Sequence, residues 1–529
     1  MRQSLGTSTL CFRGYDESSE NRNNSVEKDH FAACSAVVLS IQLGHVCCGR
    51  LPCGVGFLYG PGTKKLAFPS DFTEDSDFLA NYPNSTRFDR TQTNSVFDLI
   101  AAASYSGCSG LRLEGGLYTI SRDVADTSIV PPGFHLRGST RGNQVPNTEI
   151  QGVATDGDMG SSRIRIEGAP IDQPSTISRL LLNNVNIEIF GAEDTRLANV
   201  AVTRVVLFNT NLEGPQVRLN HVEDFEVTES IFLRGADYGG KGLQTDNSTR
   251  GRISDNCFGG GINGAGSVVA SGTNAGCPGE YFGARSVEGL ASDQGHFITA
   301  WNASEGLTES NFENNWVEGN TNTTVNVAYR GTTPKVDHGI YIKFADDITI
   351  RENHFEGWPF EGEFAARGHL KVRNASKISI LSNDIVGMHV DLRPSITPAT
   401  TGWDIPGGWA HGNVLRQSCT MIADNLFEGG EVSYNGVRKD GAPGQITAQV
   451  MVTRNQFMPH SVYSAGQGFR IRRGQRQLAM HTNDSFWIVR DDNTDGNGPV
   501  SFDITRWNRD GAGEEVASGT DRLGDECGW

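Results

Sequence analysis

The chain has 529 residues, a formal net charge of −17, 64 glycines and only 20% charged residues. This length allows a large core, and abundant glycine with few charges is typical of a turn-rich, all-β protein. The negative charge argues against general nucleic-acid binding, because a polyanion would be repelled overall, but it leaves room for a local cationic groove. No stretch is long and apolar enough to predict a membrane span.

Residues 1–90 are rich in Asn, Ser, Gly and Cys, and we assign them no fold. The uncharged, moderately apolar segment 32–49 resembles a signal-peptide core that follows a polar leader. We interpret it as a candidate export segment, so the expected location is extracellular or periplasmic. The alternative is an N-terminal arm that packs on the domain. The ten cysteines lack metal-binding spacing, and no disulfide pairing is predicted.

A capping pattern from Asn94 to Asp98 predicts a short helix that runs to about Ser106. Strands are expected next at 111–120 and 130–138. The first contains Gly-x-Leu-Tyr-x-Ile, and the second contains Pro-x-Gly-x-x-Leu-x-Gly. The helix would cover the open edge of the first strands.

A short pattern then recurs along the chain: an alternating strand, an Asn, and an apolar residue two positions later. The separations between successive copies, counted from Asn311, are 42, 30, 42, 30 and 28 residues. Repeats of this size predict the coils of a parallel β-solenoid, in which equivalent Asn side chains hydrogen-bond from coil to coil. The asparagines assigned to this position are Asn256, Asn311, Asn353, Asn383, Asn425, Asn455 and Asn483, with Ser230 in a weaker copy.

The helix, the two motifs and the Asn repeats resemble the right-handed β-helices of the pectate-lyase-like superfamily. That superfamily includes polysaccharide lyases, glycoside hydrolases and phage tailspikes, and the motifs assign no exact family within it. The resemblance implies an all-β fold: a single-stranded right-handed parallel β-helix (solenoid) over residues 91–490, with a short N-terminal capping helix. Residues 491–529 would form a C-terminal cap or tail.

Each coil also contains an earlier strand, before the strand that ends in Asn. Alternation sends Ile340, Ile342, Leu370 and Val372 inward and the residues between them outward. Because neighbouring strands lie roughly 4.8 Å apart, the outward side chains are predicted to form one basic and aromatic stripe on an otherwise acidic protein. The alternative is that these charges only solubilise a sheet face. The predicted stripe consists of Trp301, Tyr341, Lys343, Lys371, Arg373, Arg416, Arg470 and Arg472.

Such a stripe favours an anionic polysaccharide, because sugar rings stack on aromatic faces and uronate or sulfate groups pair with Arg and Lys. We expect β-elimination, in which cations neutralise the uronate while a base removes the α-proton. The catalytic candidates are Lys343, Lys371, Arg373 and Tyr341. The substrate-binding candidates are Trp301, His338, His369, Arg416, Arg470 and Arg472.

Lys371 and Arg393 are 22 residues apart, which is similar to the catalytic Lys and Arg of the β-helical alginate lyase and chondroitinase B family. The motifs that surround the pair in that family are absent, and our alignment places the two residues on different sheets. The chain is therefore not assigned to that family.

A third strand in these coils carries acids, which keeps a glycoside hydrolase with paired carboxylates as the alternative function. Glu361 and Glu363, in a loop, are weak calcium-ligand candidates, and no organic cofactor is expected. Ordinary solvated turns would explain these acids equally well. A non-catalytic, glycan-binding tailspike or adhesin is the third alternative, and a monomer is favoured. The alternative acid/base residues are Glu363, His389, Asp391, Arg393 and Glu431.

Overall fold

A computed structural model describes separate ranges of the chain between residues 96 and 491, together with Cys527. No described helix is long and apolar enough to cross a membrane. The described ranges are 110–121, 127–141, 145–153, 162–168, 173–208, 215–232, 241–258, 261–262, 268–269, 299–304, 306–318, 338–356, 369–392, 395–396, 414–434, 437–438, 445–459, 468–471 and 485–491, with Val96, Leu99 and Ile100.

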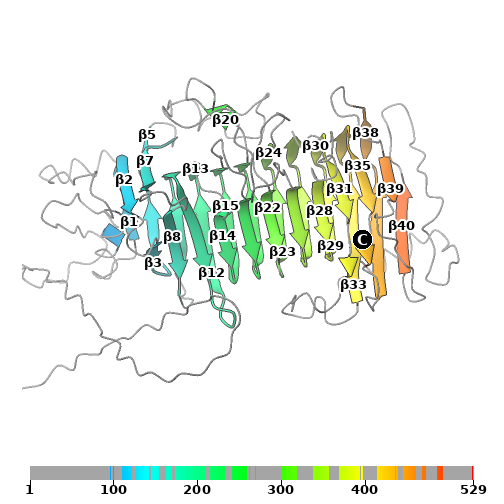
Figure 1. Cartoon of the computed structure of the whole chain (residues 1–529), viewed down its shortest axis with the longest axis horizontal. Coiled ribbons are helices and arrows are strands. Elements are labelled where there is room, and N and C mark those ends of the chain that lie inside the picture. Colours follow the sequence, from blue (N-terminus) through cyan, green and yellow to red (C-terminus); the bar gives the residue numbers. More distant parts are fainter. Residues whose placement is uncertain are drawn as a thin grey trace, which may run out of the picture. The chain divides into compact units, whose positions relative to one another are not determined.

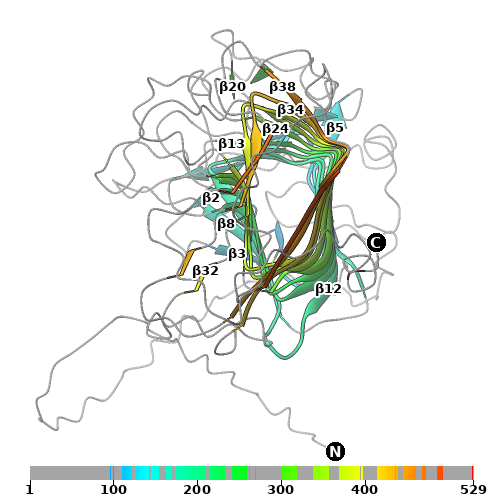
Figure 2. The same cartoon turned by 90° about the vertical axis from the view of Figure 1, so that its right-hand side faces the viewer.

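Three long parallel sheets make up the described part of the chain (Figure 1). The chain visits sheet A, then sheet B, then sheet C, and each circuit places its strands beside those of the circuit before (Figure 2). This is the right-handed parallel β-helix that the sequence predicts, and the expected fold class is confirmed.

Sheet A has 12 strands, and sheets B and C have 11 each. Sheet A consists of β1 (Gly110–Arg112), β4 (His135–Arg137), β9 (Ser175–Ser178), β12 (Leu197–Thr203), β15 (Val222–Thr228), β18 (Thr249–Ser254), β23 (Thr308–Glu313), β26 (Asp346–Arg351), β29 (Ser376–Leu381), β33 (Val414–Ala423), β37 (Gln445–Thr453) and β40 (Ser485–Asp491). Sheet B consists of β2 (Gly116–Ser121), β7 (Thr148–Val153), β10 (Leu181–Asn183), β13 (Val206–Phe208), β16 (Ile231–Phe232), β19 (Cys257–Phe258), β24 (Trp316–Glu318), β27 (His354–Glu356), β30 (Asp384–Val386), β34 (Leu426–Glu428) and β38 (Gln456–Met458). Sheet C consists of β3 (Thr127–Val130), β8 (Ser162–Glu167), β11 (Val185–Phe190), β14 (Pro215–Asn220), β17 (Lys241–Asp246), β22 (Thr299–Ser304), β25 (His338–Lys343), β28 (His369–Arg373), β31 (His389–Leu392), β35 (Glu431–Tyr434) and β39 (Gly468–Ile471). The remaining short strands are β5 (Thr140–Arg141), β6 (Val145–Pro146), β20 (Gly261–Ile262), β21 (Val268–Val269), β32 (Ser395–Ile396) and β36 (Val437–Arg438).

The recurring Asn occupies the corner between sheets A and B. At Asn353, the backbone N–H and the side-chain Nδ2 donate to Asn383 Oδ1 at 3.0 and 2.9 Å. Nδ2 also donates to the carbonyl oxygen of Phe312 at 2.9 Å, and Oδ1 accepts from Asn315. Each buried amide is thus bonded in several directions, which fixes the register of successive coils. The ladder consists of Asn256, Asn315, Asn353, Asn383, Asn425 and Asn455, and Ser230 donates its backbone N–H to its first member.

The prediction of Asn311 as a ladder residue is wrong. Asn311 lies on the exposed side of β23, and Asn315 occupies the corner instead. Asn315 is followed two positions later by the buried Val317, as the pattern requires, whereas Asn311 is followed by Glu313. The predicted member Asn483 lies outside the described residues.

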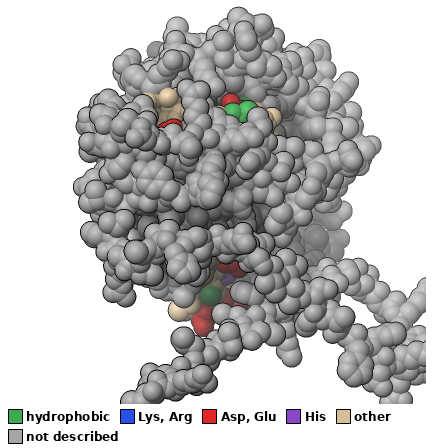
Figure 3. Space-filling model, turned by 90° about the vertical axis from the view of Figure 1, so that its left-hand side faces the viewer, with side chains coloured by type: hydrophobic (Ala, Val, Ile, Leu, Met, Phe, Trp, Pro, Cys, Tyr) green, Lys and Arg blue, Asp and Glu red, His purple; other side chains and the backbone are tan. Residues whose placement is uncertain are grey.

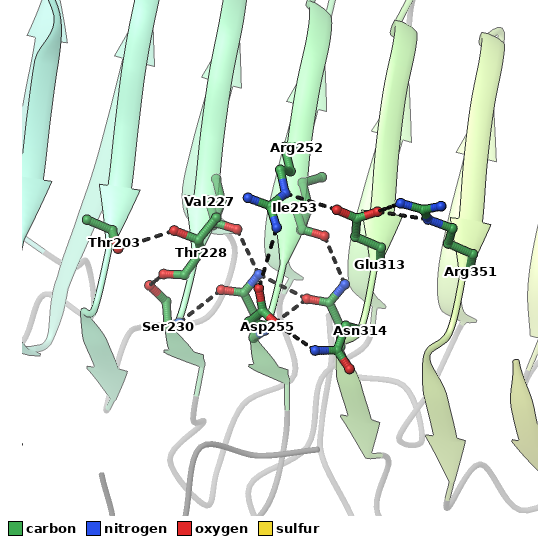
Figure 4. Close-up of polar contacts among 12 residues, drawn as sticks. Thr203, Val227, Thr228, Ser230, Arg252, Ile253, Asp255, Glu313, Asn314 and Arg351 are labelled. Carbon is green, nitrogen blue, oxygen red and sulfur yellow. Dashed lines mark hydrogen bonds and ion pairs between the residues drawn. The ribbon is translucent and has the colours of Figure 1, made fainter. Parts of the chain in front are cut away.

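The residue before each ladder Asn has a left-handed backbone, and Figure 4 shows two of these residues, Asp255 and Asn314, beside Ser230. Their φ angles are 58° and 51°, and Glu352, Ser382 and Asp424 repeat the conformation. This conformation is costly for most L-residues but is more accessible to Asn and Asp. Each corner of the Asn ladder therefore turns through one left-handed residue followed by one buried amide.

Aromatic and aliphatic side chains fill the space between the sheets. Phe232 stacks on Phe258 with ring centroids 4.4 Å apart, and Trp301 stacks on Phe312 at 4.7 Å. The inward-facing predictions Ile340, Ile342, Leu370 and Val372 are all fully buried, as expected. Val96, Leu99 and Ile100 are helical and belong to the same core. The rest of the predicted capping helix lies outside the described residues.

A disulfide bond joins Cys419, in β33, to Cys527. Cys257 is also disulfide-bonded. The described strands of the β-helix run from Gly110 to Asp491, whereas residues 1–90 and the candidate export segment at 32–49 lie outside the described residues. The domain boundaries drawn from the sequence stay predictions.

Candidate functional site

Strand register aligns outward-facing residues of sheet C into one row, which we call the outer row. Tyr341 of β25 pairs with Lys371 of β28, and Lys371 pairs with Asp391 of β31. Alternation directs these side chains away from the core, because Ile340, Ile342 and Leu370 point into it. The outer row consists of Arg165, Glu188, Arg218, Gln244, Asn302, Tyr341, Lys371, Asp391 and Ser433.

The middle of the outer row holds the strongest catalytic candidates. Arg373 Nη1 donates to the hydroxyl of Tyr341 at 3.4 Å, and Lys371 Nζ lies 5.2 Å from the centroid of the Tyr341 ring. Lys343 and Arg373 are register partners on the flank of the row, and Lys343 Nζ lies 4.7 Å from the Phe344 ring. All four candidates, Tyr341, Lys343, Lys371 and Arg373, are half-buried. Adjacent coils thus bring three cations and a phenol together.

The next two strands carry polar side chains that are buried although they point outward. His389 is 5% exposed, Asp391 2% and Glu431 0%, and Ser433 is also buried. Ser433 Oγ donates to Asp391 Oδ1 at 3.3 Å. The Glu431 backbone N–H donates to His389 Nδ1 at 3.1 Å, so His389 carries its proton on Nε2. A neutral imidazole with an Nε2–H group can donate a hydrogen bond to a substrate oxygen.

Two side-chain placements predicted from the sequence are wrong. Trp301 was expected on the outward stripe, but it pairs with Ile340, is fully buried, and donates from Nε1 to Thr245 Oγ1 at 3.1 Å. The alternation was counted one residue out of phase there. Arg416 lies in β33 of sheet A rather than in sheet C, because its strand runs directly into the strand before Asn425.

The acids of β31 and β35 were predicted on a sheet different from that of Lys371, and this prediction is also wrong. Both strands belong to sheet C, and Asp391 follows Lys371 in the outer row. A signal for this lies in the sequence itself. His369-Leu-Lys-Val and His389-Val-Asp-Leu share one pattern of His, apolar, charged and apolar residues, and they pair in that register.

Other predicted residues are described only in part or not at all. The backbones of His338, His369 and Arg470 lie in sheet C, and Arg470 pairs with Ser433, but their side chains are not described. Glu361, Glu363, Arg393 and Arg472 lie outside the described residues. The structure therefore does not test their assigned roles.

Within the described ranges, no group of three or more His, Cys, Asp and Glu side chains is arranged to hold a metal ion. The calcium candidates fall outside those ranges, so calcium binding stays a prediction. Acidic side chains are among the described ones visible in Figure 3, in keeping with the net charge of −17. The cations of the outer row are thus a local feature of an acidic protein.

No protein-family model matches the chain, and no curated protein matches it significantly. Among solved structures, it is similar to the A-module of the mannuronan C-5 epimerase AlgE4 of Azotobacter vinelandii, with 14% identity over 78% of this chain and 95% of that chain and a TM-score of 0.38. It is also similar to the surface adhesin PfbA of Streptococcus pneumoniae, with 11% identity over 77% of this chain and 87% of that chain and a TM-score of 0.39. Tailspike protein 3 of bacteriophage CBA120 has 14% identity over 78% of this chain and 60% of that chain, with a TM-score of 0.30. At these identities and TM-scores, the similarities carry no argument about function.

Proposed function

We propose that the protein cleaves an acidic polysaccharide, uronate-containing or sulfated, by β-elimination on the outer face of sheet C. The observation that carries this proposal is the contact of Arg373 and Lys371 with Tyr341, 3.4 and 5.2 Å away on adjacent coils. Cations beside a hydroxyl supply the two functions that elimination needs, which are charge neutralisation and proton transfer.

The proposed reaction begins when a base removes the proton from the carbon next to the uronate carboxylate. Lys343 and Arg373 bind that carboxylate and stabilise the negative charge that develops on it. The electron pair then forms a carbon–carbon double bond while the bond to the glycosidic oxygen breaks. Lys371 serves as the base in its neutral amine form and becomes the ammonium when it takes the α-proton. Tyr341, whose oxygen accepts from Arg373, uses its own proton to protonate the departing oxygen.

An extracellular or periplasmic location is part of this proposal. The disulfide between Cys419 and Cys527 supports it, because such bonds persist mainly in oxidising compartments. A polymeric substrate is also most accessible outside the cell.

The test is incubation of the protein with alginate, polygalacturonate, chondroitin sulfate and a sulfated algal glycan. Elimination predicts new ultraviolet absorbance from the conjugated double bond. Lys371→Ala and Arg373→Ala should abolish that absorbance while the melting temperature stays near that of the wild type. Lys377→Gly is the control, because it removes an exposed cation from sheet A at a residue whose φ of 51° suits glycine. Unchanged activity in both site variants would contradict the assignment.

A hydrolase is the second candidate, and the buried carboxyl groups of Asp391 and Glu431 on neighbouring strands favour it. Two carboxyl groups on either side of a glycosidic bond can act as acid and base. In the same assay, hydrolysis yields new reducing ends without absorbance and depends on Asp391 rather than Lys371. Retention on the polymer without any cleavage would instead indicate a glycan-binding protein.

A further inference from the structure

A second cluster lies on the outer face of sheet C, toward the N-terminal coils. The ring of Phe190, at the end of β11, is half-buried. The guanidinium carbon of Arg165, from β8, lies 5.1 Å from the ring centroid, and that of Arg218, from β14, lies 5.4 Å from it. The cluster therefore combines an aromatic ring with two cations from the strands on either side.

The two arginines differ in how firmly a carboxylate holds them. Arg165 donates to Glu188 Oε2 from Nε at 2.9 Å and from Nη2 at 2.6 Å. Arg218 approaches Asp246 at 3.4 Å, which is longer than a charge-assisted hydrogen bond of roughly 2.7–2.9 Å. The Arg218 side chain is also 39% exposed. An incoming anionic group can therefore form a shorter bond to Arg218 than Asp246 does.

Arg218 belongs to the same outer row as Tyr341. Its register neighbour Gln244 is half-buried, and Asn302, between Gln244 and Tyr341, is buried. Four strand spacings separate the strand of Phe190 from that of Tyr341, which is roughly 19 Å. A polysaccharide chain that lies along the row can reach both places only if it is several sugar units long.

In the opposite direction, the described side chains of the row are less suited to an anionic chain. Beyond Lys371 the row continues with Asp391 and Ser433, and Glu431 lies on the same strand as Ser433. These three side chains are buried, and two of them are acidic. Among the described side chains of the row beyond the reacting site, Arg218 and Gln244, on the N-terminal side of Tyr341, are half-exposed.

We propose that Phe190 and Arg218 form a distal subsite for the acidic polysaccharide, with Arg165 holding the ring in place. The chain extends from the reacting unit at Tyr341 and Lys371 toward the N-terminal coils, where a carboxylate or sulfate pairs with Arg218 and a sugar contacts Phe190. This inference rests on the proposed function. It adds the direction in which the bound polysaccharide runs along the β-helix and a preference of the protein for long chains. It also differs from the sequence-based expectation that Arg416, which lies in sheet A, is one of the substrate-binding residues.

The test measures binding by calorimetry, so it does not depend on turnover. The probes are oligosaccharides of alginate, polygalacturonate and chondroitin sulfate, prepared as dimers and as octamers. Octamers should bind the wild type about tenfold more tightly than dimers, which corresponds to one or two charge-assisted contacts. Arg218→Ala should remove this difference and leave dimer binding unchanged. Phe190→Leu, which keeps an apolar side chain in place, should weaken octamer binding alone.

Arg351→Ala is the matched control, because it removes a half-exposed arginine from sheet A, and it should bind both probes as the wild type does. Circular dichroism and melting temperatures establish that each variant is folded. Equal octamer binding by the wild type and Arg218→Ala would overturn the distal subsite and leave the proposed function standing. If neither dimers nor octamers of any probe bind, the proposed function fails and the distal subsite fails with it.

Discussion

The outer faces of sheets A and C both carry rows of charged side chains, and the contacts described for the cations on sheet A differ from those described near Tyr341 on sheet C. On sheet A, Glu313 accepts from Arg252 at 2.9 Å and from Arg351 at 2.8 and 2.6 Å (Figure 4). Arg250 forms a bidentate pair with Asp224, and Arg454 forms one with Asp424. On sheet C, the contacts described for Lys371 and Arg373 are with the ring and hydroxyl of Tyr341.

This difference shows that a row of cations does not by itself indicate a binding face. The arginines of sheet A are neutralised by carboxylates one coil away, so they connect the coils and leave little charge for a ligand. Near Tyr341, the described contacts of Lys371 and Arg373 include an aromatic ring and a hydroxyl, which are groups that can contact a sugar and transfer a proton. The contacts of each cation, rather than the number of cations, support sheet C as the functional face.

Tyr341→Phe is expected to have the largest effect, because it removes the hydroxyl of the proposed site but keeps the ring under Lys371. Loss of proton transfer should lower kcat by about 10²–10⁴-fold, with little change in KM or melting temperature. The measurement is the initial rate of cleavage on the best polymer, with Arg351→Ala on sheet A as the control. A kcat within a factor of two of the wild type would remove Tyr341 from the mechanism.

Asn353→Ala tests the register that both faces share. It deletes hydrogen bonds to Asn383, Asn315 and Phe312 and leaves buried polar groups unsatisfied, so the free energy of unfolding should fall by about 3 kcal/mol. Urea denaturation measures the change. Asn311→Ala is the matched control at an exposed position and should change stability by less than about 0.5 kcal/mol. Equal effects of the two substitutions would contradict the ladder assignment.

Glu313→Gln should reveal the smaller contribution of the ion pairs on sheet A. The substitution weakens the bonds to Arg252 and Arg351 and should cost about 1 kcal/mol of stability, less at high salt. Activity should not change, because sheet A has no role in the proposed reaction. Chemical denaturation at low and high salt measures the first effect, and a loss of activity in the folded variant would argue against assigning the site to sheet C alone.

Acidification should gradually reduce the stability that the carboxylate–arginine pairs of sheet A contribute. Burial acts to raise the pKa of Glu313, but the hydrogen bonds and charges of Arg252 and Arg351 outweigh it and lower that pKa. Hydrogen bonds from Arg250 and Arg454 lower the pKa of Asp224 and of Asp424. Since these folded-state values lie below the unfolded ones, the stabilisation is present above about pH 4 and is lost as the pH falls through the folded values.

Urea midpoints measured between pH 6 and pH 3 should therefore decline on the acid side. Glu313→Gln should flatten part of that decline, because one of the responsible groups no longer titrates. A midpoint that stays constant over this range would show that these pairs do not stabilise the fold.

The fold could be predicted from the sequence because a buried Asn recurs at the same corner of successive coils. Asn353, Asn383 and Asn425 recur with an apolar residue two positions later, and the structure places them in one ladder. Asn311 was assigned to the ladder because the strand around it reads like the others, but Asn315 is the residue that satisfies the spacing to the following apolar residue.

The site was harder to predict, because its register depends on how long each intervening connection is. Lys371 and Asp391 are separated by a coil of only 20 residues, whereas Asn383 and Asn425 are 42 apart, so counting a fixed repeat misplaces the acids. The side chain of Trp301 was predicted to point outward because no residue near it in the sequence shows which residues of its strand alternate inward. Burial against Thr245 and Phe312 becomes visible only when the sheets are assembled.

The ladder amides all point the same way along the solenoid. Five ladder residues share one set of bonds: the backbone N–H and Nδ2 donate to the coil that follows, Oδ1 accepts from the coil before, and Nδ2 also donates to a carbonyl oxygen of that earlier coil. They are Asn256, Asn315, Asn353, Asn383 and Asn425. The two directions along the ladder are therefore chemically unequal. Without the later coil, a ladder Asn loses the acceptor of its backbone N–H and of one Nδ2–H, whereas without the earlier coil it loses a donor to Oδ1 and the acceptor of one Nδ2–H.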